Sequence, residues 1–276
     1  MESADDLIQQ VRSGDYERFL AIQLARPEKR AALYALTAFA IELARVAEIV
    51  SEPLIGHIRL AWWREALEEI IAGKKPRSHP TVLALAEVYA TTPATFAELF
   101  RMIDARATDL EPGALDEKSA WRDYLDGTAG ALHSAWALVL DAQAAVTHAD
   151  AIREQARAYA TVGLLRAIPY LHAHGWNRFP RTRLDAFELE SLAPCEALNR
   201  FVLATLEQAL ARSSSTSRSS LSLPKSLNAL LSVAIFSYKY NLWLLKLQGD
   251  PYRLRPKKLG LAWEVMKINI RQRSCF

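Results

Sequence analysis

The chain has 276 residues, of which 10 are glycine, 12 are proline and 51% are hydrophobic. Few helix breakers among many strong helix formers favour an all-α fold. With 34 Lys and Arg against 31 Asp and Glu, the net charge is +3, which lacks the strongly basic footprint of a nucleic-acid-binding protein.

Capping residues and prolines indicate where the helices begin and end along the chain. Asp15, which follows Gly14, can cap a first short helix. Pro27 stands at the first turn of the next helix, where its missing N–H costs nothing. No stretch has the alternation of a strand. The predicted helices span 15–24, 27–50, 53–73, 80–91, 93–109, 116–143, 150–172, a short helix near Leu184, 194–211 and 227–245.

The most hydrophobic stretch covers residues 227–245. Asn228, Lys239 and Asn241 interrupt it, whereas a membrane span needs about 20 nearly uninterrupted apolar residues. We therefore expect a buried core helix and no transmembrane helix.

A serine-rich run at residues 212–220 is of low complexity. We predict a flexible, solvated loop there, with a phosphorylation switch as the alternative. No internal repeat divides the chain. The predicted organisation is an N-terminal segment over 1–14, one domain over 15–265 and a basic tail over 266–276.

The compartment is indicated by cysteines and by the first residues. Cys195 and Cys275 have no disulfide or zinc spacing. The acidic start lacks the apolar region of a secretory signal and the arginines of a transit peptide. We expect an unsecreted protein of the cytoplasm or the mitochondrial matrix.

Several motifs, in order, resemble those of squalene and phytoene synthases. The opening Arg30-Ala-Ala-Leu-Tyr-Ala-Leu-Thr-Ala-Phe39 resembles the family's R-x-A-L-Y-A-L-Y-A-F, and Arg59-Leu-Ala-Trp-Trp-Arg64 its R-L-x-x-W-R helix. Tyr124 with Gly127-Thr-Ala-Gly130 resembles Y-x-x-G-T-A-G, and the stretch ending in Asp250-Pro251 resembles the closing helix. The resemblance covers roughly residues 15 to 265.

This resemblance implies a single helical bundle around a deep apolar cavity. In the family, two facing aspartate-rich helices hold Mg²⁺ against the diphosphates of two prenyl substrates. A diphosphate leaves as an anion only when its charge is neutralised, and hard oxygen ligands hold the metal that does so.

Both aspartate motifs are degenerate. The first, D-D-x-x-D, falls on a segment that retains only Glu48 as a carboxylate, and Arg45 brings a positive charge to it. The second, N-x-x-R-D-x-x-x-D, retains Arg166 but neither aspartate. The residues at these motif positions are Ala44, Arg45 and Glu48 in the first, and Gly163, Arg166, Ala167 and Leu171 in the second.

One glutamate cannot hold the cations that two diphosphates require. We therefore expect no catalytic residues, no metal ligands and no cofactor. Candidate residues for lining the cavity or binding an anion are Arg45, Glu48, Arg59, Trp63, Tyr124 and Arg166.

The loss of aspartates on a retained fold resembles the subgroup that includes the mitochondrial complex I assembly factor and its bacterial relatives. Glu42-Leu-Ala-Arg45 and Val50-Ser-Glu-Pro53 carry this likeness. The first hypothesis is a non-catalytic factor or lipid-binding scaffold. Its partner would be a subunit or assembly intermediate of respiratory complex I (NADH:ubiquinone oxidoreductase), with an isoprenoid or lipid as ligand.

Two other hypotheses stay open. One is a head-to-head prenyltransferase that uses Mg²⁺ with Glu48, Asp123, Asp126 or other carboxylates. The other is a peripheral membrane protein that carries or shields isoprenoids, with the basic C-terminal stretch resting on anionic lipid; an ordinary solvated helix is the simpler interpretation of that stretch. His172 and His174 lie two apart and share no helical face, so a metal site there is disfavoured.

Overall fold

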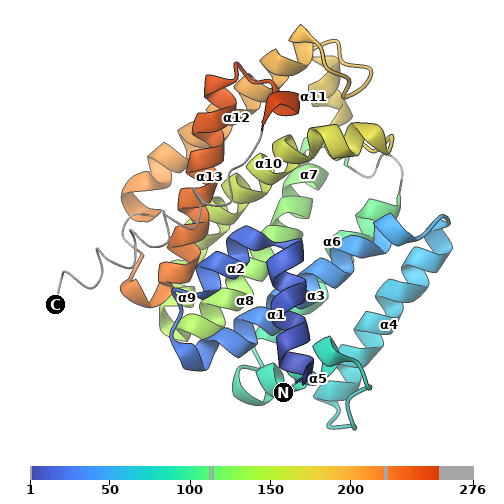
Figure 1. The fold of residues 1–276 in the computed structure, drawn as a ribbon, viewed down its shortest axis with the longest axis vertical. Coiled ribbons are helices and arrows are strands. Elements are labelled where there is room, and N and C mark those ends of the chain that lie inside the picture. The colour runs from blue at the N-terminus through green and yellow to red at the C-terminus, as the bar shows by residue number, and fades with distance from the viewer. Residues whose placement is uncertain (1, 112, 114, 221–222, 255–276) are drawn as a thin grey trace.

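The computed structural model describes residues 2–111, 113, 115–220 and 223–254, with side chains for 5–111, 113, 115–209 and 223–254. Over these residues the protein is all-α and has no strand (Figure 1). The elements are α1 Glu2–Gly14, α2 Tyr16–Ile22, α3 Pro27–Ile49, α4 Pro53–Ile71, α5 Pro80–Thr91, α6 Thr95–Ala107, η1 Thr108–Leu110, α7 Lys118–Leu125, η2 Asp126–Gly130, α8 Ala131–Leu140, α9 Ala142–Thr147, α10 Ala149–Ala173, α11 Arg181–Asp185, α12 Glu196–Ser220, η3 Lys225–Leu227, α13 Asn228–Lys246 and η4 Pro251–Arg253.

Local sequence signals start the first helices as predicted. The Asp15 carboxylate accepts a hydrogen bond from the backbone N–H of Arg18 at 3.0 Å and so caps α2. Pro27 and Pro53 occupy the first turns of α3 and α4. These three predicted helices are confirmed, with ends that shift by one or two residues.

The single long helix predicted over 116–143 is wrong. It is divided into α7, the π-helical turn η2, α8 and α9. Gly127 lies so close to α6 that a Cβ there would be 2.5 Å from the Cβ of Ala105. The Thr128 hydroxyl donates to the carbonyl oxygen of Tyr124 at 2.6 Å. The π-helical turn η2 is thus accompanied by close packing against α6 and by this hydrogen bond. The periodicity of the sequence does not indicate such a turn.

The loop predicted over 212–220 is also wrong, because α12 continues to Ser220. Once a helix is nucleated, each added residue costs little, so a run of moderate helix formers extends it. Residues 266–276, predicted as a basic tail, and Cys275 lie outside the described residues.

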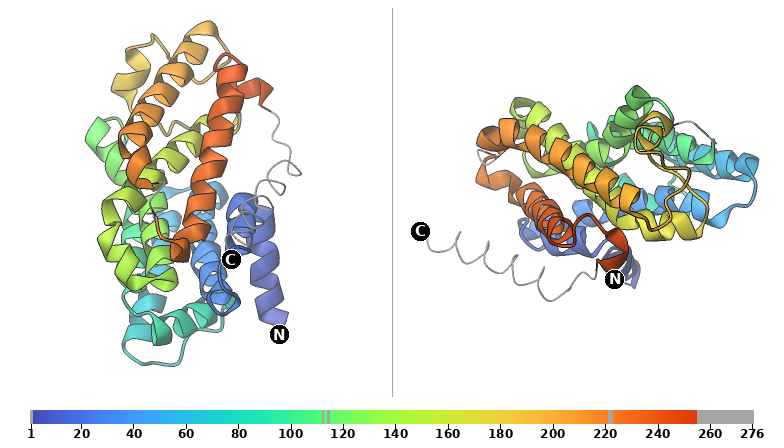
Figure 2. Two further views of the ribbon diagram at one scale, coloured as in Figure 1. Left: turned by 90° about the vertical axis from the view of Figure 1, so that its left-hand side faces the viewer. Right: turned by 90° about the horizontal axis from the view of Figure 1, so that it is seen from above.

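The long helix α10 packs against α8, α12 and α13, and α3 packs against α1, α5 and α8. The side view in Figure 2 shows α12 and α13 lying side by side along the long axis. Trp136, Phe39 and Tyr240 are among the large side chains buried in one core. Within the described residues, none of the helices combines the length and hydropathy that a membrane crossing requires.

Candidate functional site: a cavity between the two degenerate motifs

A cavity of about 270 Å³ lies where α3, α6, η2 and α10 meet. Ala44 of α3 and Gly163 of α10, one residue from each degenerate motif, both line it. The structure therefore brings one residue of each motif segment to the same cavity. Its apolar lining includes Ile41, Leu43, Met102, Leu125, Leu132 and Leu164.

Arg18 is a buried cation at this cavity, with 8% of its surface exposed. Its guanidinium pairs with Asp15, lies 3.3 Å from Nε2 of His133 and stands 4.7 Å from the ring centroid of Tyr159. Its Nε is buried with no hydrogen-bond partner. The short capped helix α2 thus places at the cavity a guanidinium whose N–H donors are not all used in hydrogen bonds.

Arg106 is the second cation that lines the cavity. Its Nη1 donates to the carboxylate of Asp109 and to the hydroxyl of Tyr124, both at 2.9 Å. Asp109 also pairs with Arg178 at 3.0 Å. The Arg106 side chain therefore extends from α6 to the cavity, and the Asp109 carboxylate and the Tyr124 hydroxyl fix its orientation.

The aromatic and imidazole groups near these cations are neutral. Burial raises the pKa of Tyr124 and of Tyr159 above the ordinary value, so both phenols keep their protons. Burial, aided by Arg18, lowers the pKa of His133 well below its usual range. The cavity wall therefore offers phenolic O–H donors and guanidinium cations.

Beside the cavity, Arg166 belongs to a separate buried cluster. Its Nη2 lies 3.0 Å from a carboxylate oxygen of Glu17, and its guanidinium lies 3.5 Å from the ring centroid of Tyr240. The Tyr240 hydroxyl donates to the same Glu17 oxygen at 2.6 Å. The surviving arginine of the second motif thus fastens α10 to α2 and α13.

The residues present do not fit the Mg²⁺ ions that the fold family implies. Magnesium prefers several carboxylate and water oxygens in octahedral geometry. Asp15 is the one carboxylate among the lining residues, and it is engaged by Arg18 and by the start of α2. Over the described chain, no three His, Cys, Asp or Glu side chains gather as a metal site.

The other predicted residues are scattered. Arg45, Glu48 and Arg59 are exposed, and none of them lines the cavity. Glu48 instead hydrogen-bonds to Tyr170. Of the six candidate residues for the cavity, only Tyr124 lines it.

Trp63 was predicted at the cavity but lies in the core, with ring centroids 5.3 Å from Phe39 and 5.1 Å from His79. Leu171 is buried and Ala167 is half-buried, and neither lines the cavity. Helical geometry explains this, because only some positions of each motif face the same side of their helix.

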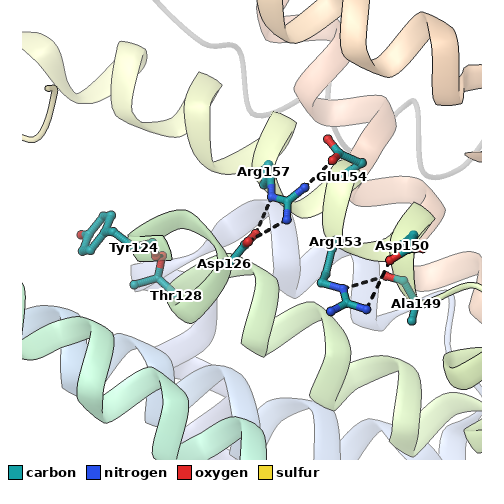
Figure 3. A network of polar contacts seen from close by, with 8 residues as sticks. All are labelled: Tyr124, Asp126, Thr128, Ala149, Asp150, Arg153, Glu154 and Arg157. Atoms are coloured by element: carbon teal, nitrogen blue, oxygen red, sulfur yellow. Dashed lines mark hydrogen bonds and ion pairs between the residues drawn. The ribbon is translucent and has the colours of Figure 1, made fainter. Parts of the chain in front are cut away.

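The carboxylates of the alternative hypothesis are also placed elsewhere. Asp123 is exposed, and Asp126 receives two hydrogen bonds from Arg157, one of them at 2.6 Å (Figure 3). Neither residue lines the cavity. Asp126 and Arg157 instead connect η2 to α10.

The two histidines do not form a site together. Nδ1 of His172 lies 2.9 Å from the hydroxyl of Tyr252, and Nδ1 of His174 lies 2.8 Å from the carbonyl oxygen of Tyr170. Both imidazoles are exposed. The two imidazoles therefore have different partners.

Sequence reasoning missed Arg18, Arg106 and Tyr159. Arg18 stands in the opening stretch next to the capping residue Asp15, but nothing local indicates that its side chain is buried. A buried arginine becomes recognisable only through the distant groups that surround it, here His133 and Tyr159.

Comparison with known proteins agrees with this fold. The curated relatives include complex I assembly factor 6 (NADH dehydrogenase (ubiquinone)) of Homo sapiens, 29% identical over 69% of this chain and 56% of its own length. The Mus musculus protein of the same name is 32% identical over 58% of this chain and 47% of its own length. The chain thus spans about half the length of these curated relatives.

Solved structures match over nearly the whole chain. A dehydrosqualene synthase superposes with a TM-score of 0.81 at 16% identity and covers 96% of each chain. Squalene synthase HpnC of Alicyclobacillus acidocaldarius has a TM-score of 0.74 at 17% identity, over 91% of this chain and 95% of its own. At such identities these structures establish the fold alone. The family model for squalene/phytoene synthase matches residues 11–262, so the chain belongs to the squalene/phytoene synthase family.

Proposed function

We propose that this protein is a non-catalytic member of its family that takes part in the assembly of respiratory complex I. The observation that carries the proposal is the cavity wall. Ala44 and Gly163 stand where the family's metal-binding motifs meet, and the cations Arg18 and Arg106 line the same cavity. Two guanidiniums beside a metal site would repel a divalent cation rather than hold it.

The named relatives supply the biological context. Two mammalian proteins named complex I assembly factor 6 share 29% and 32% identity with this chain over the matched regions. We propose that the partner is likewise a complex I subunit or an assembly intermediate. Since fold alone does not decide function, this step depends on the relatives and on the altered site together.

The cavity also supports a ligand of mixed character. Its lining is largely apolar, yet Arg18 and Arg106 place positive charge at it. We propose that it holds an isoprenoid or lipid-like molecule with a negatively charged head, bound without metal ions and without chemical change. Such a ligand would make the protein a lipid-binding scaffold in assembly.

The location follows from this role. We propose that the protein acts in the cytoplasm or the mitochondrial matrix. Contact with a membrane would be peripheral.

Disrupting the gene in the source organism is expected to lower the amount of assembled complex I on native gels. NADH:ubiquinone reductase activity should fall with it, while succinate:ubiquinone reductase activity, the internal control, stays unchanged. Reintroducing the native chain should restore complex I. A Glu48→Ala/Asp123→Ala variant should restore it equally, because these exposed carboxylates have no catalytic task. Unchanged complex I after disruption would contradict the proposal.

A further inference from the structure

A second pocket, of about 250 Å³, lies on the other side of α10, where α7, α11 and α12 approach it. Four of the residues that line it are basic, and one is acidic. They are Lys118, Arg122, Arg157, Arg183 and Glu154.

The pocket adjoins the central cavity, since Leu125 lines both, but the two use different residues of α10. Arg157, Ala158 and Thr161 line the basic pocket, whereas Tyr159 and Gly163 line the central cavity. Residues three and four apart share a helical face, and intervening residues point elsewhere. The basic pocket therefore contains none of the residues of the two degenerate motifs.

The acidic group in the pocket is already engaged. Glu154 pairs with Arg157, and the same guanidinium makes two hydrogen bonds to Asp126 (Figure 3). Arg157 is therefore fixed as part of the wall, and its charge is balanced. Besides Glu154, no carboxylate among the described lining residues stands opposite Lys118 or Arg122.

Lys118 and Arg122 are exposed and lie one turn apart on α7. Neither makes a hydrogen bond or an ion pair with any described residue. Their four-residue spacing brings two like charges to the same helical face, which is unfavourable unless an anion lies between them. Both side chains are free to turn toward a ligand in the pocket.

Arg183 enters from α11 and is held in place. Its Nη2 donates to the hydroxyl of Thr205 at 3.1 Å, and its guanidinium lies 5.6 Å from the ring centroid of Trp121 and 5.8 Å from that of Phe201. Aromatic rings that pack against a guanidinium fix its orientation without accepting hydrogen bonds from its N–H groups.

A hydroxyl completes the pocket. Thr161 lines it with only 6% of the residue exposed, and its side chain hydrogen-bonds to no described residue. The hydroxyl oxygen itself is not one of the fully buried polar atoms, so it can donate a hydrogen bond to a ligand in the pocket.

We propose that this pocket binds a phosphate group carrying about two negative charges, through Lys118, Arg122, Arg183 and Thr161. Guanidinium and ammonium groups bind phosphate oxygens by charge-assisted hydrogen bonds, and a planar guanidinium can do so bidentately. The phosphate belongs either to a small soluble phosphate or diphosphate or to an anionic lipid headgroup, since both present the same oxygens. The pocket goes beyond the proposed assembly role and does not depend on it.

The test is calorimetric titration of the full chain with inorganic diphosphate at low salt, with a chelator present so that no metal takes part. The Lys118→Ala/Arg122→Ala variant is expected to bind roughly 30-fold more weakly, because it loses two charge-assisted contacts. Thr161→Val, of nearly the same shape, should weaken binding several-fold. Arg181→Ala/Arg200→Ala removes two exposed, paired arginines outside the pocket and serves as the charge-matched control.

Native binding that the control preserves and the pocket variant loses supports the site. Equal losses in both double variants, or unchanged binding in the pocket variant, would overturn it, since the anion would then bind by general charge or in the central cavity. Absence of binding to both diphosphate and vesicles would also overturn it.

A second arm distinguishes the two sources of the phosphate. The same variants are sedimented with phosphatidylcholine vesicles containing cardiolipin, and with vesicles of phosphatidylcholine alone. Co-sedimentation that requires cardiolipin and is lost in the Lys118→Ala/Arg122→Ala variant identifies a lipid headgroup. Diphosphate binding without co-sedimentation identifies a soluble phosphate.

Discussion

Replacing Arg166 with Ala is expected to lower the free energy of unfolding by about 3 kcal/mol. The change removes the partner of Glu17, which is only 9% exposed and would remain as an uncompensated buried carboxylate. It also removes the guanidinium that lies on the Tyr240 ring at 3.5 Å. Because some solvent reaches this pair, the loss belongs at the lower end of the range for buried ion pairs.

The measurement is urea unfolding of the native and variant proteins at neutral pH. Arg153→Ala is the matched control, since Arg153 lies on the same helix and pairs with Asp150, which is fully exposed. An exposed pair of this kind contributes less than about 1 kcal/mol. Equal, small losses in both variants would show that the Glu17 cluster does not hold α10 to α2 and α13.

Replacing Trp136 with Ala should cost about 3 to 5 kcal/mol of unfolding free energy. Trp136 is fully buried on α8, and its Nε1 donates to the hydroxyl of Thr37 at 3.2 Å. Thr37 in turn donates to the carbonyl oxygen of Leu33 at 2.7 Å and lines the central cavity. The truncation therefore opens a void beside the cavity and removes a link between α8 and α3.

Thermal and urea unfolding would measure this loss, with Trp62→Ala as the control. The Trp62 side chain is on α4 with 36% of the residue exposed, so its truncation should cost far less. Trp136→Phe, which keeps most of the ring volume, should fall between the two. A Trp136→Ala protein as stable as the Trp62→Ala protein would contradict the placement of this side chain in the core.

The helical architecture could be predicted because its signals are local. Proline at the first turns of α3, α4 and α5 fixes three helix starts, and the 3.6-residue period supplies the buried faces. The π-helical turn η2 was missed because it accompanies a close approach of Gly127 to Ala105. That contact is tertiary and leaves no periodic trace in the sequence.

The site was only partly predictable for the same reason. Ala44 and Gly163, one residue from each degenerate motif, line one cavity, whereas of the six residues predicted to line it only Tyr124 does. The charged groups at the cavity and beside it are defined by distant partners: Arg18 meets His133 115 positions away, and Arg166 meets Glu17 149 positions away. Such pairs are properties of the packed bundle rather than of any local stretch.

The replacement of the family's aspartates, with Arg18 and Arg106 nearby, changes what the cavity can stabilise. A metal site for diphosphate departure concentrates negative ligands around cations. This cavity has instead a paired carboxylate, two phenols that keep their protons and two guanidiniums. Under the proposed function, such a cavity would bind an anionic headgroup and would not ionise a prenyl diphosphate.

The most direct test of the non-catalytic account is release of inorganic diphosphate from farnesyl and geranylgeranyl diphosphate. The full chain is assayed with Mg²⁺ or Mn²⁺, with and without NADPH, beside an active squalene synthase as positive control. The account predicts no release above buffer under any of these conditions. Metal-dependent release by the native chain, lost on Asp15→Asn or Glu48→Ala, would contradict it and show a working synthase with a metal site built from other carboxylates.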